Sequence, residues 1–183
     1  GYLTVSAVED GVDGRVCATT CGRGLDWKLL LALPATGLAT EKARALLPTE
    51  YSRTDAVANI QRTALLVAAF ALGRGELLCV AMQDRMHQPY RMETSPLLPR
   101  LLPLAGAPDG PGVPGVLGVA LSGAGPAVLL VLATEAATDE IADRVRLAAG
   151  DPALEIVETR MGAGALQDLP ALANRLTTAI LPD

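Results

Sequence analysis

The sequence contains few aromatic residues and little basic charge. Its 183 residues include one Trp, three Tyr and one Phe, and 15 basic residues stand against 20 acidic ones. Proteins that bind nucleic acid present a basic surface, and those that bind single strands stack the bases on aromatic side chains. Because both features are missing, we expect no nucleic-acid partner.

Histidine and cysteine are also sparse. The one histidine is His87, and the three cysteines are Cys17, Cys21 and Cys79. Cys17 and Cys21 are four residues apart, but a second pair of zinc ligands is missing, and an odd number of cysteines does not make a disulfide framework. We therefore expect no metal site, and we expect small buried cysteines in a reducing cytoplasm.

The sequence has no uninterrupted apolar segment that reads as a membrane helix. The uncharged run 116–133 is just long enough to cross a bilayer. Gly118, Gly123, Gly125 and Pro126 interrupt it, which favours two strands joined by a loop over one helix. The chain also opens without a secretory signal. These patterns predict a cytoplasmic protein without a membrane partner.

Half of the residues are apolar, which is enough to build the core of one domain or slightly more. Apolar runs with turn signals at their ends predict strands at 2–8, 14–19, 27–33, 115–120, 128–133 and 154–159. Helical spacing and end signals predict helices at 40–47, 54–72, 76–86, 96–104, 138–149 and 169–180. This order predicts an α+β fold, in which helices cover one face of a mostly antiparallel sheet.

Two of the expected helices have specific features. Thr40 is expected to cap the helix over 40–47, which Pro48 ends. In the helix over 54–72, apolar residues recur at three- and four-residue spacing and predict the buried stripe. The members of that stripe are Val57, Ile60, Ala64, Val67 and Ala71.

Thr40 and Arg44 share one face of the first helix because they are four residues apart. A hydroxyl and a guanidinium on one face suit a small anion such as a carboxylate. The alternative is an ordinary cap beside a solvated arginine. Further along, Asn59 on the long helix is a candidate ligand contact, and a structural bridge is its alternative.

The segment 84–91 reads Asp-Arg-Met-His-Gln-Pro-Tyr-Arg and holds three cationic or titratable basic side chains, Arg85, His87 and Arg91. Pro89 is expected to break the chain direction here and to fix the orientation of Arg91, which can then hold a carboxylate in a bidentate manner. The alternative is a solvated charged segment in which His87 serves packing or hydrogen bonding.

The loop between the strands at 115–120 and 128–133 consists of very small residues. It reads Ser122-Gly123-Ala124-Gly125-Pro126, so a ligand or a backbone can approach it closely. A tight connection between two core strands is the alternative, because isolated glycine motifs are weak signals.

In their order along the chain, these segments closely resemble the homoserine kinases, a branch of the GHMP kinases. The resemblance rests on Thr40-x-x-x-Arg44 with Pro48, on Asn59 with Arg62, on His87-Gln-Pro-Tyr-Arg91, and on Ser122-Gly-Ala-Gly-Pro126. It extends to about residue 165. It implies transfer of the ATP γ-phosphoryl group, with Mg²⁺, to the hydroxyl of L-homoserine in threonine biosynthesis.

The resemblance also implies roles for particular residues. Thr40, Arg44 and Arg91 fall on positions that bind homoserine, with both arginines directed to its carboxylate. Ser122, Gly123, Ala124 and Gly125 fall on the loop that lies near the phosphates. It implies no catalytic base, a homodimer, and a ferredoxin-like α/β sandwich of the GHMP C-terminal type.

One departure from the family pattern is large. The glycine- and serine-rich phosphate loop of the Gly-Leu-Gly-Ser-Ser type does not occur in these residues. We therefore expect residues 1–33 to be remnant strands of the family's N-terminal domain, 34–165 its C-terminal domain, and 166–183 a helical tail. We expect the isolated chain to be incomplete for catalysis and to bind ATP poorly.

Two other functions fit the same residues. One is a GHMP kinase for a sugar or an isoprenoid alcohol, whose substrate has no amino-acid carboxylate. The other is a non-catalytic, ferredoxin-like domain that binds a small ligand, in which the loop at 122–126 is only a tight turn.

Overall fold

The computed structural model describes residues 3–8, 16–22, 24–35, 37, 40–106 and 112–161. Its strands are β1 (Leu3–Val8), β2 (Val16–Cys21), β3 (Lys28–Leu33), β4 (Val116–Leu121), β5 (Val128–Leu132) and β6 (Glu155–Arg160). Its helices are α1 (Thr40–Ala45), α2 (Arg53–Leu72), η1 (Gly75–Leu77), α3 (Leu78–Ala81), α4 (Gln88–Arg91), η2 (Met92–Thr94), α5 (Leu97–Leu101), η3 (Leu102–Ala105) and α6 (Thr138–Ala149). The expected α+β composition with an antiparallel sheet is confirmed.

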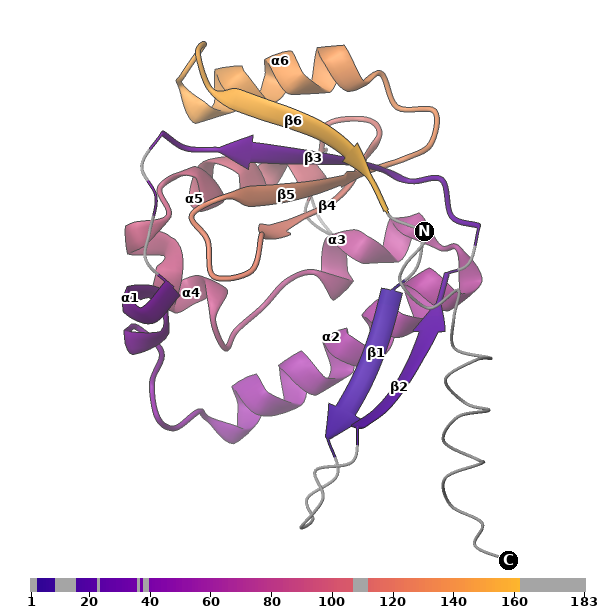
Figure 1. Cartoon of the computed structure of the whole chain (residues 1–183), viewed down its shortest axis with the longest axis vertical. Coiled ribbons are helices and arrows are strands. Elements are labelled where there is room, and N and C mark those ends of the chain that lie inside the picture. The colour runs from indigo at the N-terminus through magenta and orange to yellow at the C-terminus, as the bar shows by residue number, and fades with distance from the viewer. Residues whose placement is uncertain are drawn as a thin grey trace, which may run out of the picture.

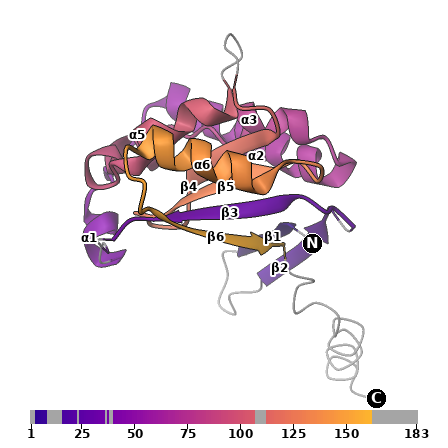
Figure 2. The same ribbon diagram turned by 90° about the horizontal axis from the view of Figure 1, so that it is seen from above.

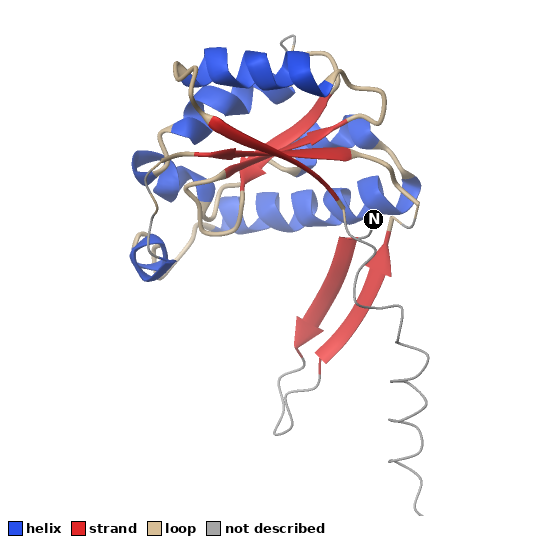
Figure 3. Ribbon diagram, turned by 45° about the horizontal axis from the view of Figure 1, so that its top comes forward, coloured by secondary structure: helices blue, strands red, loops and turns tan. Residues whose placement is uncertain are grey.

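The strands form two separate antiparallel sheets. β1 and β2 pair with each other, and the hairpin extends away from the larger sheet (Figure 3). The larger sheet has the order β4-β5-β3-β6. β3 was expected to belong with the first two strands. It instead lies between β5 and β6, because Leu30 and Ala32 bury their side chains in the main core.

Helices cover both faces of the larger sheet, so the expectation of one covered face is wrong. On one face, α5 and α6 pack against Leu30, Val128, Leu130 and Leu132. Residues between these positions, such as Val131, face α2 and α3 on the other side. Alternate side chains of a strand point to opposite faces, so these continuous apolar runs supply two cores. Figure 1 shows α6 and α2 on opposite sides, and Figure 2 shows α6 running alongside β3.

The second core forms around the one Trp and the one Phe of the chain. The rings of Trp27 and Phe70 meet edge to face, with centroids 5.1 Å apart. Leu78 and Val131 are buried against them. Edge-to-face contact of this kind adds to the stabilisation from burial. Phe70 thereby fixes the C-terminal end of α2 against the sheet.

α2 has the expected length, but its burial differs from the expected stripe. Ser52 caps its start by accepting from the Asp55 backbone N–H at 3.0 Å, and Gly73 ends it in the left-handed conformation. Ala69 and Phe70 are its buried residues. The expected stripe is largely uncovered, with Val57 at 45% and Ile60 at 68% exposure. The reason is that α2 contacts the sheet near its C-terminal end, so helical periodicity alone did not identify the packed face.

α2 is also the one described helix that is long and apolar enough to cross a membrane. Length and composition alone do not separate a membrane span from a helix of a soluble protein. In this structure the polar side chains of Asn59 and Arg62 on α2 bond to Asp84 and Gln83.

Two other helices end earlier than the sequence predicts. The expected helix at 76–86 is a 3-10 turn followed by α3, which ends at Ala81, because the Asp84 carboxylate bonds three backbone N–H groups that follow it. Pro89 lies in the first turn of α4 rather than ending a helix. This suits proline, because the first N–H groups of a helix have no partner within it. α1 begins at Thr40 itself and ends at Ala45.

The expected helix at 169–180 and most of the loop at 106–114 lie outside the described residues. Cys21 and Cys79 are free thiols and are half-buried rather than buried.

Gly118 sets how closely α3 approaches β4. A Cβ atom added there would press on the Met82 sulfur and lie 3.2 Å from Leu78 Cβ. We predict that Gly118→Val lowers the free energy of unfolding by about 2–3 kcal/mol, because overpacking forces the helix away from the sheet. Urea unfolding measures this. The control is Gly37→Ala, where a Cβ atom meets nothing within 4 Å; an equal loss in both variants would contradict the packing argument.

Candidate functional site

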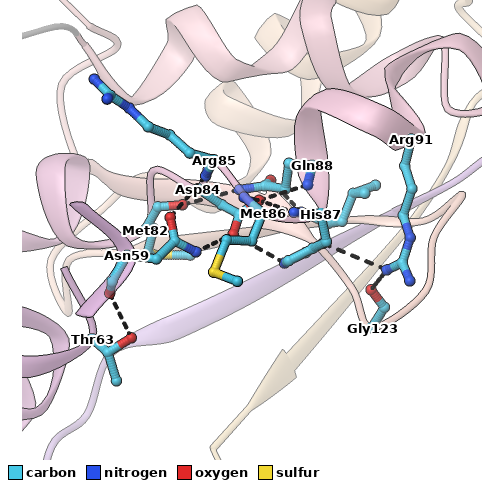
Figure 4. Close-up of polar contacts among 11 residues, drawn as sticks. Asn59, Thr63, Met82, Asp84, Arg85, Met86, His87, Gln88, Arg91 and Gly123 are labelled. Carbon is cyan, nitrogen blue, oxygen red and sulfur yellow. Dashed lines mark hydrogen bonds and ion pairs between the residues drawn. The ribbon is translucent and has the colours of Figure 1, made fainter. Parts of the chain in front are cut away.

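Three segments predicted to bind a ligand meet at the side chain of Arg91. Its Nε donates to the carbonyl of Ala43 in α1 at 3.3 Å, and its Nη1 donates to the carbonyl of Gly123 at 3.3 Å. Nη1 also lies 3.5 Å from Nδ1 of His87 (Figure 4). The guanidinium therefore joins α1, α4 and the loop of small residues, which are far apart in sequence.

Arg91 carries a buried charge that the described residues do not neutralise. Its exposure is 7%. Both carbonyls that it bonds are neutral, and no described carboxylate lies within ion-pair distance of it. A buried cation without an anion is costly to desolvate. An anionic ligand beside the guanidinium would offset that cost.

The buried polar side chains Gln88 and Ser95 also bond this loop or the strand that leads into it. Gln88 Oε1 accepts from the Leu121 backbone N–H at 3.0 Å, and Ser95 Oγ donates to the Pro126 carbonyl at 3.1 Å. Gln88 and Ser95 are 3% and 1% exposed. Sequence reasoning missed both residues. Their spacing from Arg91 could have identified them, because positions 88, 91 and 95 fall on one side of a helical path.

The loop itself is a compact turn with one open position. The Ser122 N–H donates to the Ala127 carbonyl at 2.9 Å, and the Gly125 N–H donates to the Ser122 carbonyl at 3.2 Å. Gly123 has a φ of 61°, and a Cβ atom added there would meet nothing within 4 Å. A ligand can therefore approach the backbone at Gly123 closely. Ala124 lies within the same turn.

Asp84 holds the chain that leads to Arg91. Its Oδ2 accepts from the backbone N–H groups of Met86, His87 and Gln88 at 3.1, 2.7 and 2.6 Å. Its Oδ1 accepts from the Asn59 amide at 2.6 Å (Figure 4). Burial is the largest influence on the pKa of Asp84 and raises it, but the N–H groups of His87 and Gln88 and the Asn59 amide together hold the pKa below its ordinary value.

Asn59 makes the contacts of a structural bridge. Its Nδ2 bonds Asp84 and its Oδ1 accepts from the Arg85 N–H at 2.9 Å, so both ends of the amide are used. In this arrangement Asn59 tethers the 84–88 turn to α2.

His87 is half-buried between Asp84 and Arg91. Burial is the main cause that lowers the pKa of His87; Asp84 opposes this, and Arg91 adds to it. The lowered pKa favours the neutral imidazole, and in that form the 3.8 Å contact with Asp84 is not an ion pair. In the tautomer with a free Nδ1, that nitrogen faces the Arg91 Nη1 and helps to orient it.

Thr40 and Arg44 lie on α1, which the Arg91–Ala43 bond draws to the site. Arg44 is exposed. The structure describes the backbone of Thr40 but not its side chain. The structure thus brings the helix of both residues to Arg91.

A cavity of about 340 Å³ lies between α2 and the sheet, and Asp84, His87 and Gln88 are among its lining residues. Its other walls are mainly apolar and include Leu66 and Phe70. Within the ranges that the structure describes, no three His, Cys, Asp or Glu side chains gather as a metal site would require.

Gln88 should be the residue whose loss most disturbs the end of β4. We predict that Gln88→Met lowers the free energy of unfolding by about 1–3 kcal/mol, because the buried Leu121 N–H loses its acceptor. Thermal or urea unfolding measures the change. Gln61→Met on the exposed surface of α2 is the control, and it should change stability by less than about 0.5 kcal/mol. An unchanged free energy of unfolding in Gln88→Met would refute the role assigned to Gln88.

Asp84 should control part of the stability at acid pH. Its pKa is lowered by folding, so its contribution is fully present above the ordinary value of 3.8 and is lost as the pH falls through the folded value. We predict that Asp84→Asn costs about 2–3 kcal/mol at pH 7 and clearly less near pH 2. Urea unfolding at both pH values tests this.

The control for Asp84 is Asp143→Asn, an exposed carboxylate paired with Arg146. Its effect should be less than about 1 kcal/mol at either pH. A loss for Asp84→Asn that does not depend on pH would contradict the assignment.

The chain is similar to proteins of known family. Residues 66–151 match the family model for the GHMP kinases C terminal. The homoserine kinase of Solibacter usitatus is 43% identical over 130 residues, which are 71% of this chain and 40% of that protein. The homoserine kinase of Schizosaccharomyces pombe is 47% identical over 106 residues, 56% of this chain and 30% of that protein.

Solved structures agree on the fold. The homoserine kinase of Cytophaga hutchinsonii superposes with a TM-score of 0.65 at 20% identity, over 80% of this chain and 45% of that one. The chain matches about 40% or less of the length of the curated relatives reported above. Residues 66–151 form a GHMP kinase C-terminal domain, and the chain is a homologue of the homoserine kinases.

Proposed function

We propose that this chain forms the amino-acid-binding part of a homoserine kinase, which transfers the γ-phosphoryl group of ATP to the hydroxyl of L-homoserine. The observation that carries the proposal is the buried guanidinium of Arg91, which lacks an anionic partner among the described residues. A substrate carboxylate supplies that anion. A sugar does not, and this favours homoserine over the sugar substrates of other GHMP kinases.

In this proposal Arg91 and α1 bind the amino-acid end of the substrate. The Nε and Nη1 groups of Arg91 bond backbone carbonyls, which leaves Nη2 to donate to the carboxylate. Arg44, exposed on α1, provides the second cation, and Thr40 on the same helix provides a hydroxyl. Two arginines directed to one carboxylate fix its orientation as well as its charge.

The loop Ser122–Gly125 forms the wall of the site near the phosphates. Small residues and the open position at Gly123 allow a phosphate oxygen to approach the backbone. Phosphoryl transfer depends mainly on positioning and charge stabilisation. The three bonds from Gln88, Arg91 and Ser95 keep the loop in place while the homoserine oxygen bonds to phosphorus, the bond from phosphorus to the ADP oxygen breaks, and the hydroxyl proton passes to solvent. We assign no catalytic base.

ATP and Mg²⁺ belong to the proposed reaction but are not assigned to residues of this chain. The described carboxylates do not gather in a group that would hold a metal ion. Similarity to homoserine kinases supports the further proposals of a homodimer, a cytoplasmic location and a role in threonine biosynthesis.

The sheet pairing also bears on the domain boundary. We propose that the GHMP C-terminal domain begins at β3 rather than at residue 34, because β3 lies between β5 and β6. Residues 1–21 with the β1–β2 hairpin then belong to a preceding domain, and 166–183 remain the tail.

The test is ADP release by the complete encoded polypeptide with two acceptors, L-homoserine and 3-amino-1-propanol, which has the same amine and hydroxyl but no carboxylate. We expect Arg91→Gln and Arg44→Gln each to lower kcat/KM for homoserine by about 100-fold, and to change the small rate with aminopropanol by less than about threefold. Arg44→Gln is informative even if the buried Arg91 variant fails to fold, because Arg44 is exposed.

Arg144→Gln on the exposed surface of α6 is the matched control and should leave both rates unchanged. No ADP release with homoserine would overturn the proposed activity. Equal losses with both acceptors would show that the arginines do not act on the carboxylate.

A further inference from the structure

A second cavity lies beside the N-terminal half of α2; it shares Arg62 with the 340 Å³ cavity, but neither Arg91 nor the 122–126 loop lines it. Its volume is about 580 Å³, which is within the range of small-molecule sites. α2 supplies most of its lining, and Val80 of α3 and Arg85 of the segment that follows α3 close it.

Three arginines line this cavity, Arg53, Arg62 and Arg85, and no acidic residue does. Among the described residues, Asp55 is the one carboxylate paired with any of them, at 3.6 Å from Arg85. The whole chain carries a net charge of −5, so this concentration of positive charge runs against its composition. The cavity therefore favours an anion.

Arg62 adds an observation that ordinary surface arginines lack. Its Nη2 donates to the Gln83 side chain at 3.0 Å, but its Nη1 is buried and has no hydrogen-bond partner among the described residues. A buried donor without an acceptor is costly, so each such group in a native protein calls for a partner. The Arg62 side chain also lines the cavity, so an anion bound there would lie beside a guanidinium that has an unfilled donor.

The walls between the arginines are apolar. Val57, Ala58, Leu65 and Val80 line the cavity together with the charged groups. Inorganic phosphate would leave these apolar walls in contact with water, whereas an organic phosphate covers them. Guanidinium groups match phosphate through paired N–H donors.

We propose that this cavity binds a small organic phosphate, with the phosphate held by Arg53, Arg62 and Arg85 and the organic part against the apolar walls. The proposal does not depend on the kinase activity, because the cavity contains neither Arg91 nor the 122–126 loop. A failed titration and a failed kinase assay are thus separate results.

The test is calorimetric titration of the full chain with phenyl phosphate, inorganic phosphate and benzoate. We expect one bound phenyl phosphate per chain, and binding of inorganic phosphate and of benzoate that is each at least about tenfold weaker. Amide NMR shifts on binding should centre on residues 53–65 and 80–85. Benzoate as tight as phenyl phosphate would overturn the assignment of phosphate.

The key variant is Arg53→Gln with Arg85→Gln, since both residues are exposed and the fold should tolerate the change. We expect it to weaken phenyl phosphate binding by at least about tenfold. The matched control is Arg144→Gln with Arg160→Gln, which removes the same charge from exposed positions elsewhere. Equal weakening in both pairs, or no binding at about 10 mM ligand, would overturn the proposal.

Discussion

The arrangement of the site depends on one buried guanidinium. Arg91 is bonded to the Ala43 carbonyl of α1 and to the Gly123 carbonyl of the small-residue loop, and His87 lies beside it. Carbonyl oxygens hold the group in position without neutralising it. The same contacts that fix the geometry of three distant segments therefore leave a positive charge ready for an anion. This is the property that an amino-acid-binding site requires.

A second set of bonds places that guanidinium. The Asn59 amide on α2 donates to the Asp84 carboxylate. That carboxylate in turn accepts hydrogen bonds from the backbone N–H groups that lead into α4. Gln88 then ties α4 to Leu121, the last residue of β4. The position of Arg91 thus follows from a continuous series of hydrogen bonds that runs from α2 to the sheet. Loosening any bond in the series should broaden the range of positions that Arg91 adopts.

Local patterns in the sequence predicted the segments but not how they pack. The extent of α2, expected at 54–72 and found at Arg53–Leu72, follows from local signals, and the strands on either side of the loop follow from apolar runs. The face that α2 buries could not be predicted from local patterns. It depends on the contact between Phe70 and Trp27, which are far apart in sequence. The partner strands of β3 are likewise a long-range property, since a six-residue apolar run fits either sheet.

The candidate site was likewise predicted only where local patterns were sufficient. Arg91 and the loop were predicted from residue type and order, whereas Gln88 and Ser95 were missed because their importance comes from burial. The most direct test of the account is the ¹⁵N NMR signal of the Arg91 Nε–H group during titration with L-homoserine and with 3-amino-1-propanol. A carboxylate that reaches the guanidinium should shift this signal with homoserine alone. An unchanged signal at saturating homoserine, or equal shifts with both compounds, would contradict the account.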